Sequence, residues 1–584
     1  MRFSRRTLFG QVLLALLTLS AIQGFAQDRN PGIFQGYTAP PSSSMRFLAS
    51  DAGKQALLHS PSPMALPLLQ RFHPDAVGQY PQQPMMQAGP LGGPRGPVTV
   101  AGCGTASGTV MNLEPALNAV AQGQPSVDFL LSELGSGEDL VVETGNDNRG
   151  LLGTFDSLSG VYVHRDPTVT CYGGTDFEMG NPIIPDPLNP GDSLYSVGGS
   201  RVLADPNPAH KQFLIMDTRV DDTTSGIGLR RVPTSNFEST TTCPAGTLTP
   251  SQEATCIGTQ AIIVTASLDN LADAPSFAQD PRTSGTGAGD IYIVNTSFRY
   301  LRSVTTLTAC KATFATTADC STPIIVSGSS DGTQFPSVAV IGGGPNAGAV
   351  AITYLDGDQI VFISCTPAGA PANPVCGHHS TVRNDPNLYA QLTNNTIQYD
   401  PWPVVAARTD TSGQTIFVVW SDCKAVSSYP LVGCADADVT MSFATNLASP
   451  SWTAGSVTGA TGHQFTPSIA YDSGQNVINI AYYSTGIDAY KNRVVMLARQ
   501  ILPGTTTVTG ITTVTTSYDS TEGDGTTYYF EENPIGDFMG LAAHGGSGSG
   551  SSRLYLGFTN NARLGMYGSI TNTQADNNVS RLTY

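Results

Sequence analysis

Polar side chains recur at two matching points of a pattern that repeats along this chain. Six of them stand just before an apolar segment: Gln124, Asp273, Gln334, Asp400, Gln464 and Asp537. Seven others stand at the end of the β-rich segment that follows: Asp147, Asp217, Asn295, Asp356, Asp422, Ser484 and Asn560. Their oxygen and nitrogen atoms can bind the hydroxyls of a ligand, or a cation. Turns and strand ends also favour these residue types, because short polar side chains bond to nearby backbone groups, so a structural role stays open.

Four arginines follow the second segment of their repeats: Arg149, Arg219, Arg299 and Arg563. On a common face their guanidinium groups could hold a carboxylate, because arginine binds that group with two parallel hydrogen bonds. They could equally form structural ion pairs with the neighbouring acids. We take the charged residues together as a candidate ligand-binding face. Its members are Asp147, Arg149, Asp217, Arg219, Asp273, Arg299, Asp356, Asp400, Asp422, Asp537 and Arg563.

The sequence holds no complete set of residues for a catalytic reaction. It lacks the GxSxG, HExxH, P-loop and strand-linked GxGxxG motifs, and neither CxxC spacing nor histidine spacing indicates a metal site. We therefore predict no metal and no cofactor, and we name no catalytic residue. The acidic segment 521–533 could bind calcium, but it lacks the alternating oxygen ligands of an EF-hand and also suits a solvated loop.

The elements that must position these residues are strands in repeated units. Segments such as "QPSVDFLL" at 124 and "QFTPSIAY" at 464 place a small residue or proline before an alternating apolar strand. Equivalent positions lie 61 to 75 residues apart, at Pro125, Ser200, Pro275, Pro336, Pro403, Pro467 and Met539. A turn and a second strand follow each copy, with room for two more strands. Four-stranded units at this period predict an all-β fold, a β-propeller of about seven blades.

The propeller prediction also gives the polar residues a common location. In such a ring the first strand of each blade lines the central channel, and the second strand returns antiparallel to it. The start of strand one and the end of strand two therefore lie on the same face. We expect the two polar sets to surround one mouth of the channel.

Ten cysteines are present, and eight fall into close pairs. The expected disulfides join Cys243 to Cys256, Cys310 to Cys320, Cys365 to Cys376 and Cys423 to Cys434, and the remaining pair would be Cys103 with Cys171. Each short loop closed in this way contributes about 2–3 kcal/mol to stability. Disulfides in this number indicate an oxidising compartment.

The start of the chain also indicates export. Residues 1–26 follow the basic, apolar and small-residue order of a secretory signal peptide. The motif Ser4-Arg5-Arg6-Thr7 leaves the twin-arginine route open, although the cysteines favour the general secretory route to the periplasm or the outside. Residues 27–98 are rich in Pro, Gln and Ser and predict a linker or arm, whose stretch 66–72 could dock on the domain at 99–584.

Charge and hydropathy restrict the partners. The formal net charge of −17 makes nucleic acid a poor partner, because phosphate contacts need basic residues. No segment after the signal peptide is apolar enough to span a membrane. We expect a monomer whose partner is an extracellular glycan or protein.

The patterns "PSVAV…GAVAITYLD" and "GDFMGLAA…RLYLGFTNNAR" resemble the exported sialidase-like propellers, across residues 110–580. The Asp-box of that superfamily has no intact copy here, and 327–335 carries a fragment with different spacing. The resemblance implies a glycan-related function. True sialidases use three arginines, a Tyr–Glu pair and an acid–base Asp, and no Tyr and Glu can be paired here from sequence.

Three functions follow as expectations. The first is a non-catalytic binding module for a glycan or protein at the channel mouth. The alternative is a glycoside hydrolase similar to exo-sialidases, and the second alternative is a structural envelope or surface protein that uses the arm to contact a partner.

Overall fold

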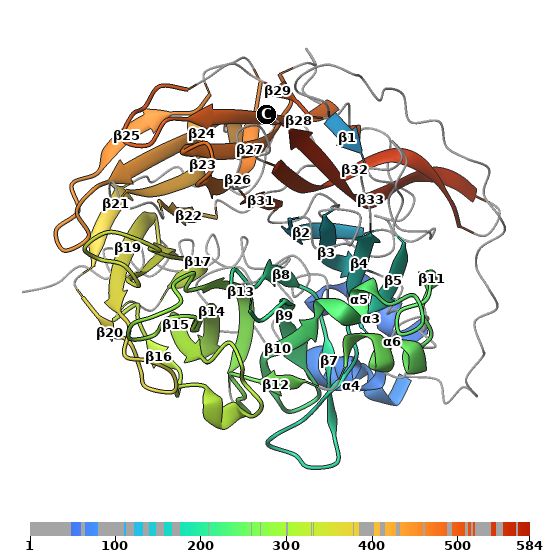
Figure 1. Ribbon diagram of the computed structural model, residues 1–584. Coiled ribbons are helices and arrows are strands. Elements are labelled where there is room, and N and C mark those ends of the chain that lie inside the picture. The colour runs from blue at the N-terminus through green and yellow to red at the C-terminus, as the bar shows by residue number, and fades with distance from the viewer. Residues whose placement is uncertain are drawn as a thin grey trace, which may run out of the picture.

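A computed structural model describes the following residues of the chain: 48–59, 65–79, 110–112, 122–131, 139–147, 157–165, 176–207, 209–258, 260–268, 270–299, 302–328, 330, 332–377, 379–384, 402–408, 415–427, 433–458, 462–486, 493–508, 512–514, 518–519, 539–544, 553–567 and 570–583. They form a β-propeller of seven antiparallel sheets, as the repeats predict (Figure 1).

The first three blades come from the first half of the chain. Blade 1 contains β2 (Gln122–Leu130), β3 (Leu140–Asp147), β4 (Ser159–Arg165), β5 (Phe177–Gly180) and the added β11 (Gly246–Thr247). Blade 2 contains β6 (Ile184–Pro185), β7 (Ser193–Ser196), β8 (Arg201–Ala204), β9 (Gln212–Val220), β10 (Ser225–Pro233) and β12 (Ala261–Ile263). Blade 3 contains β13 (Leu271–Gln279), β14 (Ile291–Arg299), β15 (Arg302–Cys310) and β16 (Ile324–Ile325).

The other four blades continue around the ring. Blade 4 contains β17 (Thr333–Val340), β18 (Val350–Asp356), β19 (Gln359–Thr366), β20 (Val375–Cys376) and β21 (Ser380–Asn384). Blade 5 contains β22 (Val404–Ala407), β23 (Ile416–Ser427), β24 (Gly433–Ala444) and β25 (Thr453–Ser456). Blade 6 contains β26 (Gln464–Asp472), β27 (Val477–Ser484), β28 (Arg493–Ile501), β29 (Thr512–Thr513) and β30 (Tyr518–Asp519). Blade 7 contains β31 (Gly540–His544), β32 (Arg553–Tyr567) and β33 (Ile570–Thr583).

The ring closes by pairing the two ends of the domain. The short strand β1 (Val110–Asn112) is antiparallel to β33, with Val110 opposite Leu582, and it becomes the outer strand of blade 7. An N-terminal strand therefore completes the C-terminal sheet. The sequence does not reveal this pairing, because it joins segments at opposite ends of the domain.

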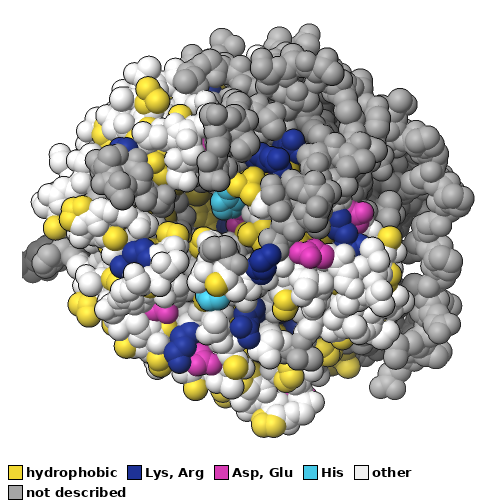
Figure 2. Space-filling model, viewed as in Figure 1, with side chains coloured by type: hydrophobic (Ala, Val, Ile, Leu, Met, Phe, Trp, Pro, Cys, Tyr) yellow, Lys and Arg dark blue, Asp and Glu magenta, His cyan; other side chains and the backbone are white. Residues whose placement is uncertain are grey.

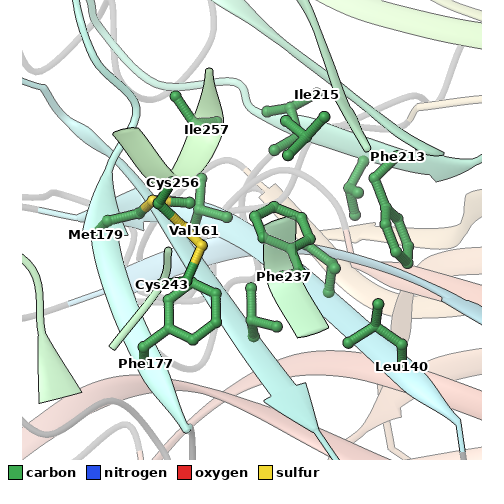
Figure 3. Packing of buried hydrophobic residues seen from close by; sticks show 14 of the residues in the cluster. Leu140, Val161, Phe177, Met179, Phe213, Ile215, Phe237, Cys243, Cys256 and Ile257 are labelled. Atoms are coloured by element: carbon green, nitrogen blue, oxygen red, sulfur yellow. A yellow bond between two sulfur atoms is a disulfide. The ribbon is translucent and has the colours of Figure 1, made fainter. Parts of the chain in front are cut away.

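Apolar clusters fill the spaces between neighbouring blades. Between blades 1 and 2, for example, Leu140, Val161 and Phe177 pack against Phe213 and Ile215 (Figure 3). Clusters of the same kind join blades 2 and 3, 3 and 4, 4 and 5, 5 and 6, 6 and 7, and 7 and 1. The core is thus a ring of interfaces, each made by alternating apolar residues of two adjacent sheets.

The repeated proline marks a β-bulge in the innermost strand. The pairing register shifts between Asp273 and Ser276, and likewise at Gly123–Ser126, Gln334–Ser337 and Phe465–Ser468. The residue before the proline has a left-handed backbone in three blades: φ is 49° at Ala274, 52° at Phe335 and 47° at Thr466. Such an extra residue bends the strand and changes the direction of the residues that follow.

The serine after the proline links blade 1 to blade 2 and blade 4 to blade 5. Ser126 Oγ accepts a hydrogen bond from the backbone N–H of Val202 at 3.2 Å, and Ser337 Oγ accepts one from Val405 at 3.1 Å. The Pro-Ser pair, which the sequence presents as the start of a strand, therefore stabilises the contact between innermost strands.

In the described part of the arm, three short helices pack against the propeller. The helices are α3 (Asp51–His59), α4 (Ala65–Phe72) and the 3-10 helix η1 (Pro74–Gln79). Their buried residues, including Leu57, Leu69 and Phe72, form a cluster with Val220 of blade 2 and Phe298 of blade 3. The docking expected for 66–72 is seen in α4, whereas composition alone did not predict the helices. The arm covers the face on which second strands end, beside blades 1 to 3.

Replacing Leu69 with alanine is expected to loosen this arm. The Leu69 side chain is fully buried in the cluster, and a buried leucine cut back to alanine costs about 2–5 kcal/mol. Limited proteolysis should then cleave within residues 48–79 at least about tenfold faster. Leu66 lies on the same helix with 37% of its surface exposed, so Leu66→Ala is the matched control and should leave the cleavage rate nearly unchanged. Equal rates in all three proteins would contradict the packing described.

The four short-range disulfides form as predicted: Cys243–Cys256, Cys310–Cys320, Cys365–Cys376 and Cys423–Cys434. The first joins the loop after α5 (Thr234–Glu238) to α6 (Pro250–Ile257), inside the cluster of Figure 3, and the second encloses the 3-10 helix η3 (Thr317–Asp319). Cys103 and Cys171 lie outside the described residues.

Within the described part, no helix is long and apolar enough to cross a membrane.

Candidate functional site

The strand register confirms that first-strand starts and second-strand ends share one face. Asp147 at the end of β3 lies opposite Gln122, and Asp356 at the end of β18 lies opposite Thr333. In blade 6, Gln464 lies opposite Ser484. The described members of the candidate face therefore lie on this rim, and what their side chains touch differs from blade to blade.

Asp217 and Arg219 of β9 belong to a buried charged cluster. Arg219 Nε donates to Asp217 Oδ1 at 2.7 Å, and Asn181 Nδ2 donates to Asp217 Oδ2 at 2.9 Å. Arg230 of β10 lies beside them and donates to the backbone oxygen of Ile183 at 2.9 Å. Burial, with a smaller effect of the Arg219 charge, lowers the pKa of Arg230 to about 9. The exposed fraction of Asp217 is 1% and that of Arg219 is 0%. Both side chains therefore stabilise blade 2 and do not reach the solvent at the rim.

Asp147 and Asp422 are also buried and bonded within their blades. Tyr162 donates its hydroxyl to Asp147 Oδ2 at 2.6 Å. Asp422 forms an ion pair with Lys424 and accepts a hydrogen bond from the Thr440 hydroxyl at 3.2 Å. These contacts connect the second and third strands of their blades.

Asp273, Asp356 and Arg299 make contacts of other kinds at the same rim. Asp273 Oδ1 accepts a hydrogen bond from the backbone N–H of Ala274 at 2.7 Å, and this bond supports the left-handed residue before the bulge. Asp356 accepts one from the Ser330 hydroxyl at 2.5 Å. Arg299 is half-buried at the turn between β14 and β15, where burial and the nearby Arg302 charge lower its pKa.

Three members, Arg149, Asp400 and Asp537, lie outside the described residues, as does the possible calcium segment 521–533. Arg563 lies in β32 opposite Gln574, and its side chain is not described. Ligand binding by the candidate face stays a prediction.

A cavity of about 290 Å³ lies in the central channel. Its walls come from the innermost strands of all seven blades, so it is built by the repeat itself. Serine residues from four blades contribute to it: Ser126, Ser276, Ser337 and Ser468. Apolar side chains such as Phe277 and Val338 fill much of the remaining wall. The wall therefore combines polar and apolar groups, and polar groups that converge in a concave cavity are typical of a small-ligand site.

Arg201 and Trp402 approach each other in this channel from blades 2 and 5. The Arg201 guanidinium carbon lies 4.9 Å from the centre of the Trp402 ring, which is cation–π distance. Arg201 Nε also donates to the Pro275 oxygen at 3.2 Å, and Trp402 Nε1 donates to the Pro336 oxygen at 3.1 Å. Backbone groups of blades 3 and 4 thus fix both side chains where the innermost strands begin.

Asp128 and His544 line the same cavity at the opposite ends of the innermost strands. His544 Nε2 is bonded to Asp128 Oδ1 at 2.8 Å, and the backbone N–H of Ala204 donates to Asp128 Oδ2 at 2.7 Å. Burial favours a lower pKa for His544, but the charge and hydrogen bond of Asp128 raise the pKa above its usual 6.5. The pair connects blade 7 to blades 1 and 2.

These side chains make the channel suited to binding a small polar ligand. Figure 2 shows a histidine and hydrophobic side chains near the middle of one face of the ring. Arg201, His544 and Asp128 offer a donor, a titrating group and an acceptor, whereas the Trp402 ring is only 4% exposed and packs against Arg201. Among the described residues, no group of three or more His, Cys, Asp and Glu side chains is arranged to hold a metal ion.

The channel residues were missed from the sequence, although one of them leaves a signal. Arg201 follows Ser200 at the position that Ser126, Ser276, Ser337 and Ser468 occupy in other blades. A charged residue in place of a repeated serine could have indicated a special position. Trp402 and His544 carry no such signal, because bulky residues and histidines also occur in ordinary strands.

No protein-family model matches the chain, and no curated protein matches its sequence. Its structure is similar to that of an α-L-arabinofuranosidase from Fusarium graminearum, with a TM-score of 0.37 and 10% identity over 68% of this chain and 98% of that one. A sialidase from Trypanosoma rangeli gives a TM-score of 0.35 and 11% identity over 69% of this chain and 58% of that one.

An exo-β-1,3-galactanase from Phanerochaete chrysosporium gives a TM-score of 0.27 and 10% identity, over 80% of this chain and 92% of that one. Likenesses this low do not bear on what this chain does. Membership of the sialidase-like superfamily stays a prediction, and the function has to be inferred from the channel.

Proposed function

We propose that the protein is an exported propeller that binds a glycan in its central channel. The observation that carries this proposal is the cavity of about 290 Å³, which the Arg201–Trp402 pair lines near one end and the Asp128–His544 pair near the other. Sugars combine apolar C–H faces with many hydroxyls, and this lining offers both apolar side chains and paired polar groups. Export is supported by the four disulfides, which are typical of proteins that fold in oxidising compartments.

The hydrolase alternative needs a second carboxyl group in the channel. Glycoside hydrolysis generally uses two carboxyl groups about 5–10 Å apart across the scissile bond. Among the described residues that line the cavity, Asp128 is the one carboxylate, and it is already bonded to His544 and to the backbone. The proposal is therefore binding without turnover.

The direct test is a glycan array, run beside a panel of chromogenic glycosides, with the purified mature protein. Binding without cleavage is the expected result. Turnover of any glycoside would overturn the non-catalytic proposal in favour of the hydrolase alternative. No binding on the array and no cleavage of any glycoside would overturn glycan binding. That result would favour the alternative of a structural surface protein.

Filling the channel is expected to abolish this binding. Ala470 lies half-buried in the cavity wall, so Ala470→Phe would occupy space that a ligand needs. We expect the affinity for an array-selected glycan to fall at least about tenfold, measured by calorimetry. The control is Ala372→Phe at an exposed position of the loop closed by Cys365–Cys376, and it should bind as the unaltered protein does. Equal affinity of both variants would place the ligand outside the channel.

A further inference from the structure

His544 has one ring nitrogen held and the other available. Its Nε2 is bonded to Asp128, its ring lies edge-on to Phe129 with centroids 4.6 Å apart, and its side chain is 38% exposed. Among the described residues, none forms a hydrogen bond with its Nδ1. The residue lines the cavity, so Nδ1 can reach a molecule bound in the channel.

Asp128 is fixed independently of the histidine. Its Oδ2 accepts the backbone N–H of Ala204 at 2.7 Å, and its Oδ1 accepts that of Phe129 at 2.8 Å. A carboxylate held in this way fixes the orientation of a bonded imidazole. The pair is therefore organised before any ligand arrives.

We propose that His544 donates a hydrogen bond from Nδ1 to an acceptor oxygen of the saccharide in the channel, and that protonation of its ring switches this contact on. The inference rests on the proposed glycan-binding function and adds the residue and the pH dependence. With Nε2–H directed at Asp128, a neutral ring presents only a lone pair at Nδ1. The protonated ring presents an N–H instead, and a charge-assisted hydrogen bond is stronger than a neutral one.

The groups that face His544 favour its protonated form. Asp128 of β2, Asp139 before β3 and Asp472 at the end of β26 all raise its pKa. Arg553 of β32 lies opposite His544 in the sheet, and it forms an ion pair with Asp139. Burial acts in the other direction but does not cancel the acids. The imidazolium is thus present below a pKa that lies above 6.5, and it is lost as the pH rises through that value.

A second Asp–His pair provides the matched control. His210 Nδ1 is bonded to Asp205 Oδ2 at 2.7 Å in the turn between β8 and β9 of blade 2. It resembles the Asp128–His544 pair in chemistry, but neither residue lines the cavity. His210→Gln therefore removes an aspartate-bonded histidine that lies away from the proposed ligand.

The experiment measures the affinity of an array-selected saccharide by calorimetry from pH 5.5 to pH 9. We expect the affinity of the unaltered protein and of His210→Gln to fall about tenfold as the pH rises, which is the effect of one charge-assisted hydrogen bond. His544→Gln should bind weakly at all pH values with a flat profile. In NMR titrations of the histidine rings, saturating saccharide should raise the pKa of His544 by about one unit, because a tenfold preference for the protonated form requires it.

The outcomes separate the two proposals. Saccharide binding with a flat profile in the unaltered protein, or with an unchanged profile in His544→Gln, would overturn the role of His544 and leave glycan binding intact. If saturating saccharide left the pKa of His544 unchanged, the role of His544 would also be overturned. This measurement needs no variant. A protein that binds no saccharide at any pH would overturn the proposed function and this inference with it.

Discussion

Asp217→Ala is expected to lower the free energy of unfolding by about 3–5 kcal/mol. The substitution removes the carboxylate that Arg219 Nε contacts at 2.7 Å and leaves Arg219 and Arg230 buried without it. An unpaired buried charge costs far more than an exposed one, because the protein interior cannot replace the lost hydration. Chemical denaturation followed by tryptophan fluorescence and circular dichroism measures the change.

Asp356→Ala is the matched control for this prediction. Asp356 also ends a second strand, but it is half-buried and bonded to the Ser330 hydroxyl. Its loss should cost about 1 kcal/mol or less. Equal free energies of unfolding for the two variants would contradict the prediction. They would mean that the contacts of Asp217 do not stabilise blade 2.

Gly540→Ala is the second substitution for which we expect a large effect. A Cβ atom at Gly540 would lie 2.5 Å from the backbone nitrogen of Val127 and 2.9 Å from the carbonyl carbon of Ser126. Both atoms belong to the backbone of β2, so the innermost strands of blades 7 and 1 would have to separate. We expect a loss of about 3 kcal/mol or more in the free energy of unfolding, since backbone atoms cannot move aside as a flexible side chain can.

The control for ring closure is Gly557→Ala, at the residue directly opposite Gly540 in the sheet. A Cβ atom there would meet the Pro125 side chain at 3.3 Å and the Val127 side chain at 3.5 Å, so a small adjustment is enough. Its stability should change by less than about 1 kcal/mol. Similar losses in the two variants would show that the tight contact between blades 7 and 1 does not decide closure. Both free energies come from the same denaturation experiment.

The sequence predicts the propeller because its signals are local and repeated. Pro275, Pro336 and Pro467 each mark a bulge, and a serine follows each of them in the sequence. The four short disulfides are predictable for the same reason, since their cysteines lie close together along the chain. The closing strand β1 is not, because it pairs with β33 across the whole domain.

The sequence does not predict which polar side chains are buried or which distant residues come together. Asp217 and Arg219 stand where a rim residue should stand, yet bonds within blade 2 bury both side chains. The helices of the arm depend on contacts with Val220 and Phe298, which their own composition does not reveal. The channel group of Arg201, Trp402, Asp128 and His544 comes from four different blades, so no spacing in the sequence brings its members together.

The most direct test of the account is an experimental structure of the protein with its array-selected saccharide bound. We predict one sugar unit in the central channel, between the Arg201–Trp402 contact and His544, with an acceptor oxygen within hydrogen-bond distance of His544 Nδ1. A saccharide bound at the outer rim or on the arm, with the channel empty, would contradict the central claim.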